Sequence, residues 1–139
     1  MLPIMRCVTV TLWANPSGTT AEVLMWLMTK YGFYSIVQKR PDEYHVRGRE
    51  RKDIENLVAG VPLLKTEIME SADTDYAVRI IVRKPEVLAI LNFLGENLDY
   101  SNFKDKIDRT SDQARKPYHE VWRVMANALG AYGRKPKNF

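Results

Sequence analysis

The sequence is poor in the residues that build disulfide frameworks and metal centres. Its 139 residues include one cysteine, Cys7, and two histidines, His45 and His119. A single cysteine cannot form an intrachain disulfide, and this usage favours a reducing compartment, so we expect a cytoplasmic protein. With two histidines and no carboxylates at matched spacing, we expect no metal site, and no motif indicates a cofactor.

Long hydrophobic runs are also missing. The apolar run near the N-terminus, CVTVTLWA, is short and is followed by residues 15–18, Asn-Pro-Ser-Gly. It falls well below the roughly 18 apolar residues of a membrane-spanning helix, so we expect no membrane contact. The composition, with 45% hydrophobic and 27% charged residues, is typical of a globular domain with its own core.

The N-terminal residues have two interpretations. Met25 and Met28 lie just before the first clearly patterned strand, so residues 1–24 can be an extension that arises from the choice of start codon. In this interpretation one domain covers residues 25–133, followed by a basic tail over 134–139. We then expect a chain without residues 1–24 to fold.

In the other interpretation the N-terminal residues belong to the fold. Residues 6–13, RCVTVTLW, alternate valine and leucine with threonine, as a strand does. Ser17 or Thr19 can then cap a helix through residues 21–30. This strand and helix would give the first six elements the order βαββαβ, which is ferredoxin-like.

From Tyr31 onward the pattern predicts an α+β fold. RKDIENLVAG places Ile54 and Leu57 at helical spacing, and Pro85 opens a second helix. The expected core is therefore ββαββα, with an antiparallel sheet, helices on one face and extra helices near the C-terminus. Aromatic and β-branched residues predict the strands over residues 31–38, 43–50, 65–70 and 76–83.

The stretch from residue 98 to 125 concentrates aromatic residues at helical spacing. Ser101 can cap a first helix, a loop follows over residues 110–117, and Pro117 starts the next helix. We expect most of the aromatic side chains to close the core and Trp122 to be substantially buried. The last helix carries a continuous apolar stripe of Tyr118, Val121, Trp122, Met125, Leu129 and Tyr132.

Strand alternation gives the clearest functional indication. The chain has 21 Lys and Arg against 17 Asp and Glu, a net charge of +4. Alternation places Arg47 and Arg49 on one face of their strand, and Arg79 and Arg83 opposite Tyr76 on theirs. If the strands are neighbours, the four guanidinium groups can hold phosphate or carboxylate. The alternative is that they are neutralised across the sheet by Glu43, Glu50, Glu67, Glu70 and Asp75.

Four segments carry a family resemblance. MWLMTKYGFYSIVQK, TDYAVRIIV, LDYSNFK and YHEVWRVM resemble, in this order, a small bacterial protein family that is common in cyanobacteria and has no assigned biochemical activity. The resemblance covers about residues 25–125 and implies a start near Met25, but it transfers no catalytic residue. Asn102 and Lys104 are the matching positions hardest to explain as core residues. The matching positions are Lys30, Tyr31, Tyr76, Arg79, Tyr100, Asn102, Phe103, Lys104, Tyr118, His119 and Trp122.

Three classes of function follow from these patterns. The first is a non-enzymatic small binding or regulatory module whose ligand is an anion or an unknown protein, because no catalytic set is recognisable. The second is nucleic-acid (RNA) binding through the basic sheet face, although the aromatic and glycine signature of RNA-binding modules is absent. The third is an enzyme. His119 and Glu120 cannot form a simple dyad, since adjacent helical residues do not face each other. The candidate ligand-binding residues are Arg47, Arg49, Arg79, Arg83, Asn102, Lys104 and His119.

Overall fold

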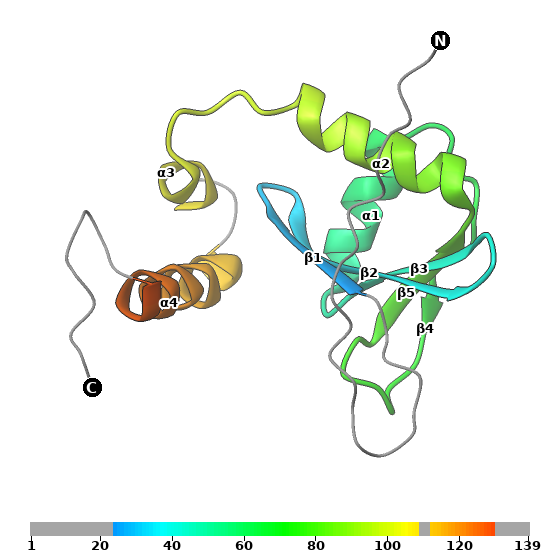
Figure 1. Cartoon of the computed structure of the whole chain (residues 1–139), viewed down its shortest axis with the longest axis horizontal. Coiled ribbons are helices and arrows are strands. Elements are labelled where there is room, and N and C mark those ends of the chain that lie inside the picture. The colour runs from blue at the N-terminus through cyan, green and yellow to red at the C-terminus, as the bar shows by residue number, and fades with distance from the viewer. Residues whose placement is uncertain (1–23, 109–111, 130–139) are drawn as a thin grey trace, which may run out of the picture.

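A five-stranded antiparallel sheet forms the centre of the computed structural model, which describes residues 24–108 and 112–129 (Figure 1). The strand order is β1-β2-β3-β5-β4, and neighbouring strands are antiparallel. The predicted α+β class, with extra helices after the core, is confirmed. The elements are β1 (Leu24–Thr29), β2 (Gly32–Arg40), β3 (Glu43–Gly48), α1 (Arg51–Gly60), β4 (Met69–Glu70), β5 (Val78–Val82), α2 (Lys84–Glu96), α3 (Phe103–Asp108) and α4 (Asp112–Leu129).

The core lies between one face of the sheet and the helices α1 and α2. Strand alternation turns Val46 of β3 and Ile80 of β5 toward this layer, where both are fully buried. Helix α1 meets them with Ile54 and Leu57, as the helical spacing predicted, and α2 contributes Ile90. We call this side of the sheet the inner face and the opposite side the outer face.

The segment just before Tyr31 is a strand, and the helix proposed over residues 21–30 is therefore wrong in its described part. β1 forms a hairpin with β2, in which Leu24 pairs with Val37 and Thr29 with Gly32. The ferredoxin-like alternative required that helix, so it does not describe residues 24–30. Residues 1–23 and the basic tail lie outside the described residues, as do the strand and helix cap proposed there.

The bounds of all four predicted strands differ from the prediction. The strand expected over residues 31–38 is Gly32–Arg40, and the one expected over 43–50 ends at Gly48. The strand expected over residues 65–70 is reduced to Met69–Glu70, and the one expected over 76–83 begins at Val78. These last two differences shorten strands at the same edge of the sheet, where only β5 pairs with β4. β4 pairs with β5 at Met69 and Glu70 alone, so the segment before it has no ladder of backbone hydrogen bonds to hold it in the sheet.

Helix α4 departs from the prediction in both its start and its packing. It begins at Asp112, so most of the loop expected over residues 110–117 is helical and Pro117 lies inside the helix. Proline removes one backbone hydrogen bond there but does not end the helix. Trp122 is 44% exposed, and the expectation that it is substantially buried is wrong. Of the predicted stripe, Tyr118 is buried, whereas Val121, Trp122, Met125 and Leu129 are exposed.

The exposure of this stripe follows from where α4 is attached. Helices α3 and α4 lie beside the end of the sheet that bears the β1–β2 turn (Figure 1). Phe103 of α3 and Tyr118 of α4 stack with ring centroids 6.2 Å apart. The Nζ atom of Lys30, in the turn, lies 2.8 Å from a carboxylate oxygen of Asp99. The contact of Phe103 is with the first half of α4, and the helix beyond Tyr118 extends away from the sheet (Figure 1), so its apolar residues remain at the surface.

Candidate functional site

Three arginines and one tyrosine gather on the outer face of the sheet. Arg47 of β3 and Arg79 of β5 are directly opposite each other in the antiparallel register. Their neighbours Val46 and Ile80 are buried on the inner face, so alternation fixes both arginines on the outer face. Arg49 follows β3 on the same side. The two strands are thus neighbours in the sheet, as the prediction required, and their pairing brings three of the four predicted arginines together.

Tyr76 is the centre of this group, which we call the arginine cluster (Arg47, Arg49, Arg79 and Tyr76). The Cζ atoms of Arg47 and Arg49 lie 4.6 and 4.8 Å from the centroid of the Tyr76 ring. Alternation had placed Tyr76 on the face opposite Arg79, and this is wrong. The residue precedes β5, which begins at Val78, so the pleat of the strand does not set its direction.

Between residues that the structure describes, the hydrogen bonds of the cluster go to neutral acceptors. Arg49 donates to the backbone oxygen of Asp75 over 3.0 Å, and Arg79 donates to the hydroxyl oxygen of Thr74 over 2.9 Å. Arg79 also donates to the backbone oxygen of Tyr76, and Arg47 donates to the hydroxyl oxygen of Ser35 over 2.9 Å. Neutral acceptors orient a guanidinium group without cancelling its charge.

The acidic residues expected to neutralise the cluster have other roles. Glu43 lies close to Arg40 and His45, and Glu70 pairs with Arg51. Asp75 offers its backbone oxygen to Arg49, and among the described residues neither Arg49 nor Arg79 pairs with a carboxylate. The expected neutralisation of these two arginines therefore does not occur within the described part of the chain.

The positive charge of the cluster acts on a neighbouring lysine. Lys39, near the end of β2, has a pKa below the usual lysine value, first because of its partial burial and then because of the charges of Arg47 and Arg79. A lower lysine pKa means that the surroundings disfavour one more positive charge. The charges of Arg47 and Arg79 thus reach Lys39 on the outer face, although desolvation is the larger cause of its lower pKa.

Arg83 does not join the cluster. It precedes α2, where its guanidinium group lies 2.7 Å from the carboxylate of Asp42 in the β2–β3 turn. The Asp42 carboxylate also accepts a hydrogen bond from the backbone N–H of Lys84. These two donors, the backbone N–H first, hold the pKa of Asp42 below its usual value. Arg83 thus joins the β2–β3 turn to the start of α2.

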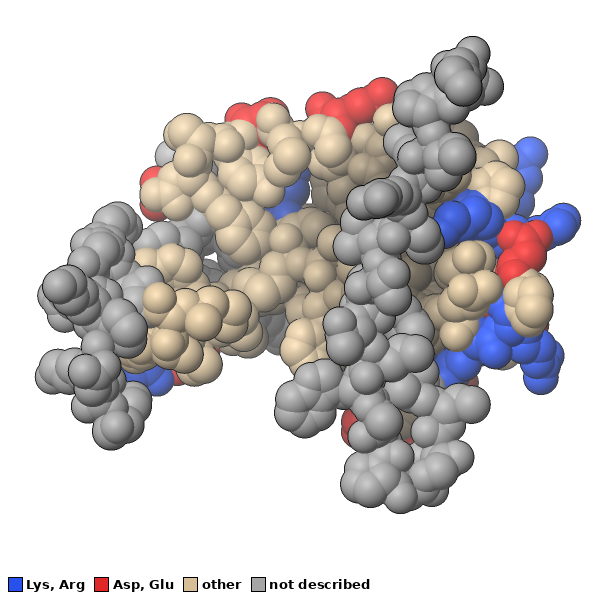
Figure 2. Space-filling view, in the orientation of Figure 1, with Lys and Arg blue, Asp and Glu red and all other residues tan. Residues whose placement is uncertain are grey.

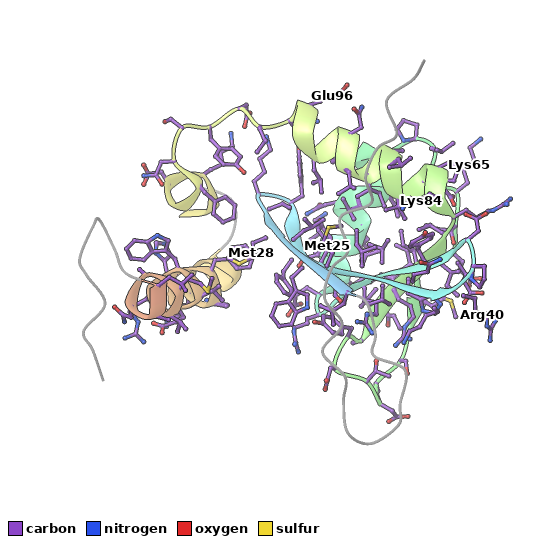
Figure 3. All side chains as sticks on the ribbon, viewed as in Figure 1. Met25, Met28, Arg40, Lys65, Lys84 and Glu96 are labelled. Carbon is purple, nitrogen blue, oxygen red and sulfur yellow. The ribbon has the colours of Figure 1, made fainter. Side chains whose placement is uncertain are left out.

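A second candidate site is an apolar groove on α4, with a volume of about 380 Å³. It brings together Asn102 and His119, two of the predicted site residues. Met28 of β1 contributes to the wall, and its side chain lies between the sheet and α4 (Figure 3). The side chain of Lys104, the third residue predicted in this region, is outside the described part. The other lining residues are Phe103, Tyr118, Val121, Trp122 and Met125, and we call this site the α4 groove.

Three of the segments that carry the family resemblance meet at the β1–β2 turn. Lys30 and Tyr31 of the first segment lie in the turn, and Lys30 pairs with Asp99 of the third. Phe103, also in the third segment, stacks on Tyr118 of the fourth. The residues that carry the resemblance therefore lie at the junction between the sheet and α4.

Charge divides the visible surface into two parts. Lysine and arginine side chains gather on the side of the molecule that bears the β2–β3 turn, whereas the visible surface around α4 is largely uncharged (Figure 2). Within residues 24–108 and 112–129, no group of three His, Cys, Asp or Glu side chains could hold a metal ion. No helix in the same ranges is long and apolar enough to cross a membrane.

Comparisons of the chain with protein-family models, curated proteins and solved structures find no match. The function must therefore be inferred from the geometry. Sequence reasoning missed Ser35 and Lys39, which lie with Arg47 on the outer face. The pairing register of the β2–β3 hairpin, which depends on its turn, could have revealed them. In this register Ser35 is opposite Arg47.

Proposed function

We propose that the protein is a small non-enzymatic binding module that holds an anionic ligand, RNA in the first place, at the arginine cluster. The observation that carries the proposal is the direct opposition of Arg47 and Arg79 across β3 and β5. Like charges at directly opposite positions of a sheet destabilise it, by about 0.2 to 1 kcal/mol. Two guanidinium groups held at one point of the sheet favour a bound anion there.

The cluster has the chemistry that phosphate recognition requires. Each guanidinium group presents a planar fork of N–H donors that matches two phosphate oxygens. The Tyr76 ring holds the planes of Arg47 and Arg49 by cation–π contact, which reduces the freedom they would lose on binding. A phosphate group would also relieve the repulsion between Arg47 and Arg79.

The test compares two double variants that remove the same charge. Arg47→Gln/Arg79→Gln removes the opposed pair, and Arg51→Gln/Arg123→Gln removes two exposed arginines that pair with glutamates elsewhere. Binding of a fluorescently labelled single-stranded RNA of about 12 nucleotides is measured by anisotropy at several salt concentrations. We expect the first variant to bind at least tenfold more weakly, because charge-assisted hydrogen bonds contribute about 1.5 to 3 kcal/mol each. The second should bind nearly as wild type does.

The dependence on salt gives a second readout. Each phosphate contact on a single strand contributes about −0.7 to the slope of log K against log salt concentration, so loss of two contacts should reduce the slope by about 1.4. Wild-type protein without salt-sensitive binding would overturn the proposal. Equal losses in the two double variants would also overturn it, since binding would then depend on net charge and not on the cluster.

The exposed face of α4 favours a second candidate, self-association with another copy of the chain. Trp122, Val124, Met125 and Leu129 are all more than two-fifths exposed, and Leu129 reaches 76%. Arg123 is the only charged residue between positions 121 and 129, so two copies can meet along this face with little charge repulsion. Sedimentation should show association as the protein concentration rises and a monomer for Trp122→Glu. A wild-type chain that stays monomeric at high concentration would exclude this candidate.

We also propose that the chain belongs to the bacterial family that it resembles and that it acts in the cytoplasm. The meeting of three family segments around Lys30, Asp99 and Tyr118 supports the family, because shared residues then have a shared structural purpose. The single cysteine supports a reducing compartment.

A further inference from the structure

An exposed tryptophan lies in the same row of the sheet as the opposed arginines. The register aligns Trp26 of β1 with Ser35 of β2, Ser35 with Arg47, and Arg47 with Arg79. Residues aligned in this way share one face of the sheet, so all four side chains belong to the outer face. An aromatic side chain at the edge and two guanidinium groups at the centre thus follow one line across the sheet.

Trp26 is in an unusual environment for its size. Its side chain is 63% exposed although it belongs to a strand of the central sheet. It touches the ring of Phe33, with centroids 6.0 Å apart and planes tilted by 59°. This contact supports one part of the indole ring and leaves most of its surface open to solvent. An indole ring braced in this way can stack on a planar ligand.

The distance from Trp26 to the positive charge suits a nucleotide. Neighbouring strands lie about 4.8 Å apart, so the backbones of β1 and β3 are separated by about 10 Å. The Arg47 guanidinium reaches back over the intervening strand, where it donates to the hydroxyl oxygen of Ser35 over 2.9 Å. Its charge therefore lies about one strand spacing from β1, within the reach of a phosphate attached to a base on Trp26.

We infer that the ligand is single-stranded nucleic acid, with one base stacked on Trp26 and the phosphate groups held by Arg47 and Arg79. This inference rests on the proposed anion binding at the arginine cluster and specifies its ligand. Stacking requires a base that has left its pair, so a duplex or a simple polyanion would use the arginines alone. Because every base has an aromatic face, we expect little sequence preference.

The experiment compares ligands and tryptophan variants. Wild-type protein, Trp26→Ala and the control Leu88→Ala, which removes an exposed apolar side chain of α2, are titrated with single-stranded RNA, single-stranded DNA, a duplex of the same length and inorganic polyphosphate. We expect Trp26→Ala to weaken binding of both single strands about 5- to 100-fold and to leave polyphosphate binding unchanged. Trp26→Phe keeps an aromatic ring and should recover most of the affinity. Leu88→Ala should bind as wild type does.

Two results would overturn the inference, and they separate it from the proposed function. If Trp26→Ala binds single strands as tightly as wild type while Arg47→Gln/Arg79→Gln binds weakly, anion binding stands and the stacking site is wrong. If the wild-type protein binds neither nucleic acid nor polyphosphate, both are wrong. A loss in Trp26→Ala that Trp26→Phe does not recover, or that extends to polyphosphate, would also reject stacking. Circular dichroism of each variant checks that the fold is retained.

Discussion

Gly32→Ala places a methyl group where the end of the β1–β2 turn packs against α1. Gly32 has a φ angle of +154°, which side chains with a Cβ atom rarely adopt. A Cβ atom built there would lie 2.5 Å from the Cβ of Asp53 and closer still to its carboxyl carbon. Because the clash includes a Cβ atom, rotation of the Asp53 side chain cannot relieve it and the backbone must move.

The movement would disrupt the hydrogen bonds between the hairpin and the helix. The Asp53 carboxylate accepts a hydrogen bond from the backbone N–H of Phe33 over 3.1 Å, and its backbone oxygen accepts one from the hydroxyl of Tyr34 over 2.8 Å. Backbone strain costs about 1 to 3 kcal/mol, and loss of a charge-assisted hydrogen bond about 1.5 to 3 kcal/mol. The lower entropy of the unfolded alanine variant offsets about 0.4 to 1 kcal/mol. We therefore expect Gly32→Ala to lower the free energy of unfolding by about 2 to 5 kcal/mol.

Urea denaturation followed by far-ultraviolet circular dichroism measures this change. With a slope of about 2 kcal/mol/M, the midpoint should fall by about 1 to 2.5 M. Gly95→Ala is the matched control, because an added Cβ at this position of α2 meets nothing within 4 Å. Alanine there should leave the free energy of unfolding unchanged or raise it by up to about 1 kcal/mol. The reasoning is refuted if Gly32→Ala lies within about 0.5 kcal/mol of wild type.

The remaining predictions concern the core, the α4 face and the pH dependence of stability. Ile90→Ala removes a fully buried side chain and should cost about 2 to 5 kcal/mol in urea denaturation, and a cost under 1 kcal/mol would contradict the packing of α2. Trp122→Ala should cost well below the roughly 3 to 5 kcal/mol of a buried tryptophan, since the side chain is 44% exposed, and a full loss would show that it is covered. The pKa of Asp53 is raised, and burial is the largest cause. The folded protein therefore holds this proton more tightly than the unfolded chain does. Its stability should decrease as the pH rises from the unfolded pKa of about 3.9 through the folded pKa. Asp53→Asn, which can still accept the hydrogen bond from Phe33, should reduce this decrease, and a stability difference from wild type that stays constant between about pH 3 and 7 would contradict the cause.

Local pattern was sufficient for the elements whose two sides differ clearly. Helix α1 was predicted from the spacing of Ile54 and Leu57, and both side chains are buried. The outward direction of Arg47 and Arg79 followed from the alternation of their strands. In each case apolar and charged residues alternate with the period of one kind of element, helix or strand, and this period identifies the element and its buried side.

Local pattern was insufficient for the segment that became β1. Residues 24–29, LMWLMT, are apolar without a clear period, and such a run suits a helix or a strand equally well. Pairing with β2 decides for a strand, because it satisfies the backbone hydrogen bonds of both. The register of this pairing also brought Trp26 into line with Ser35 and the opposed arginines.

The sequence by itself determined the fold class, the helices of the core and the outward direction of Arg47 and Arg79, because these depend on the period of nearby residues. Only the tertiary structure decided that Tyr76 joins the arginines, that Arg83 pairs with Asp42, and that Trp122 stays at the surface. An apolar stripe predicts that a helix face can be buried, but burial needs a partner surface, and the position of that surface depends on how distant segments of the chain pack together.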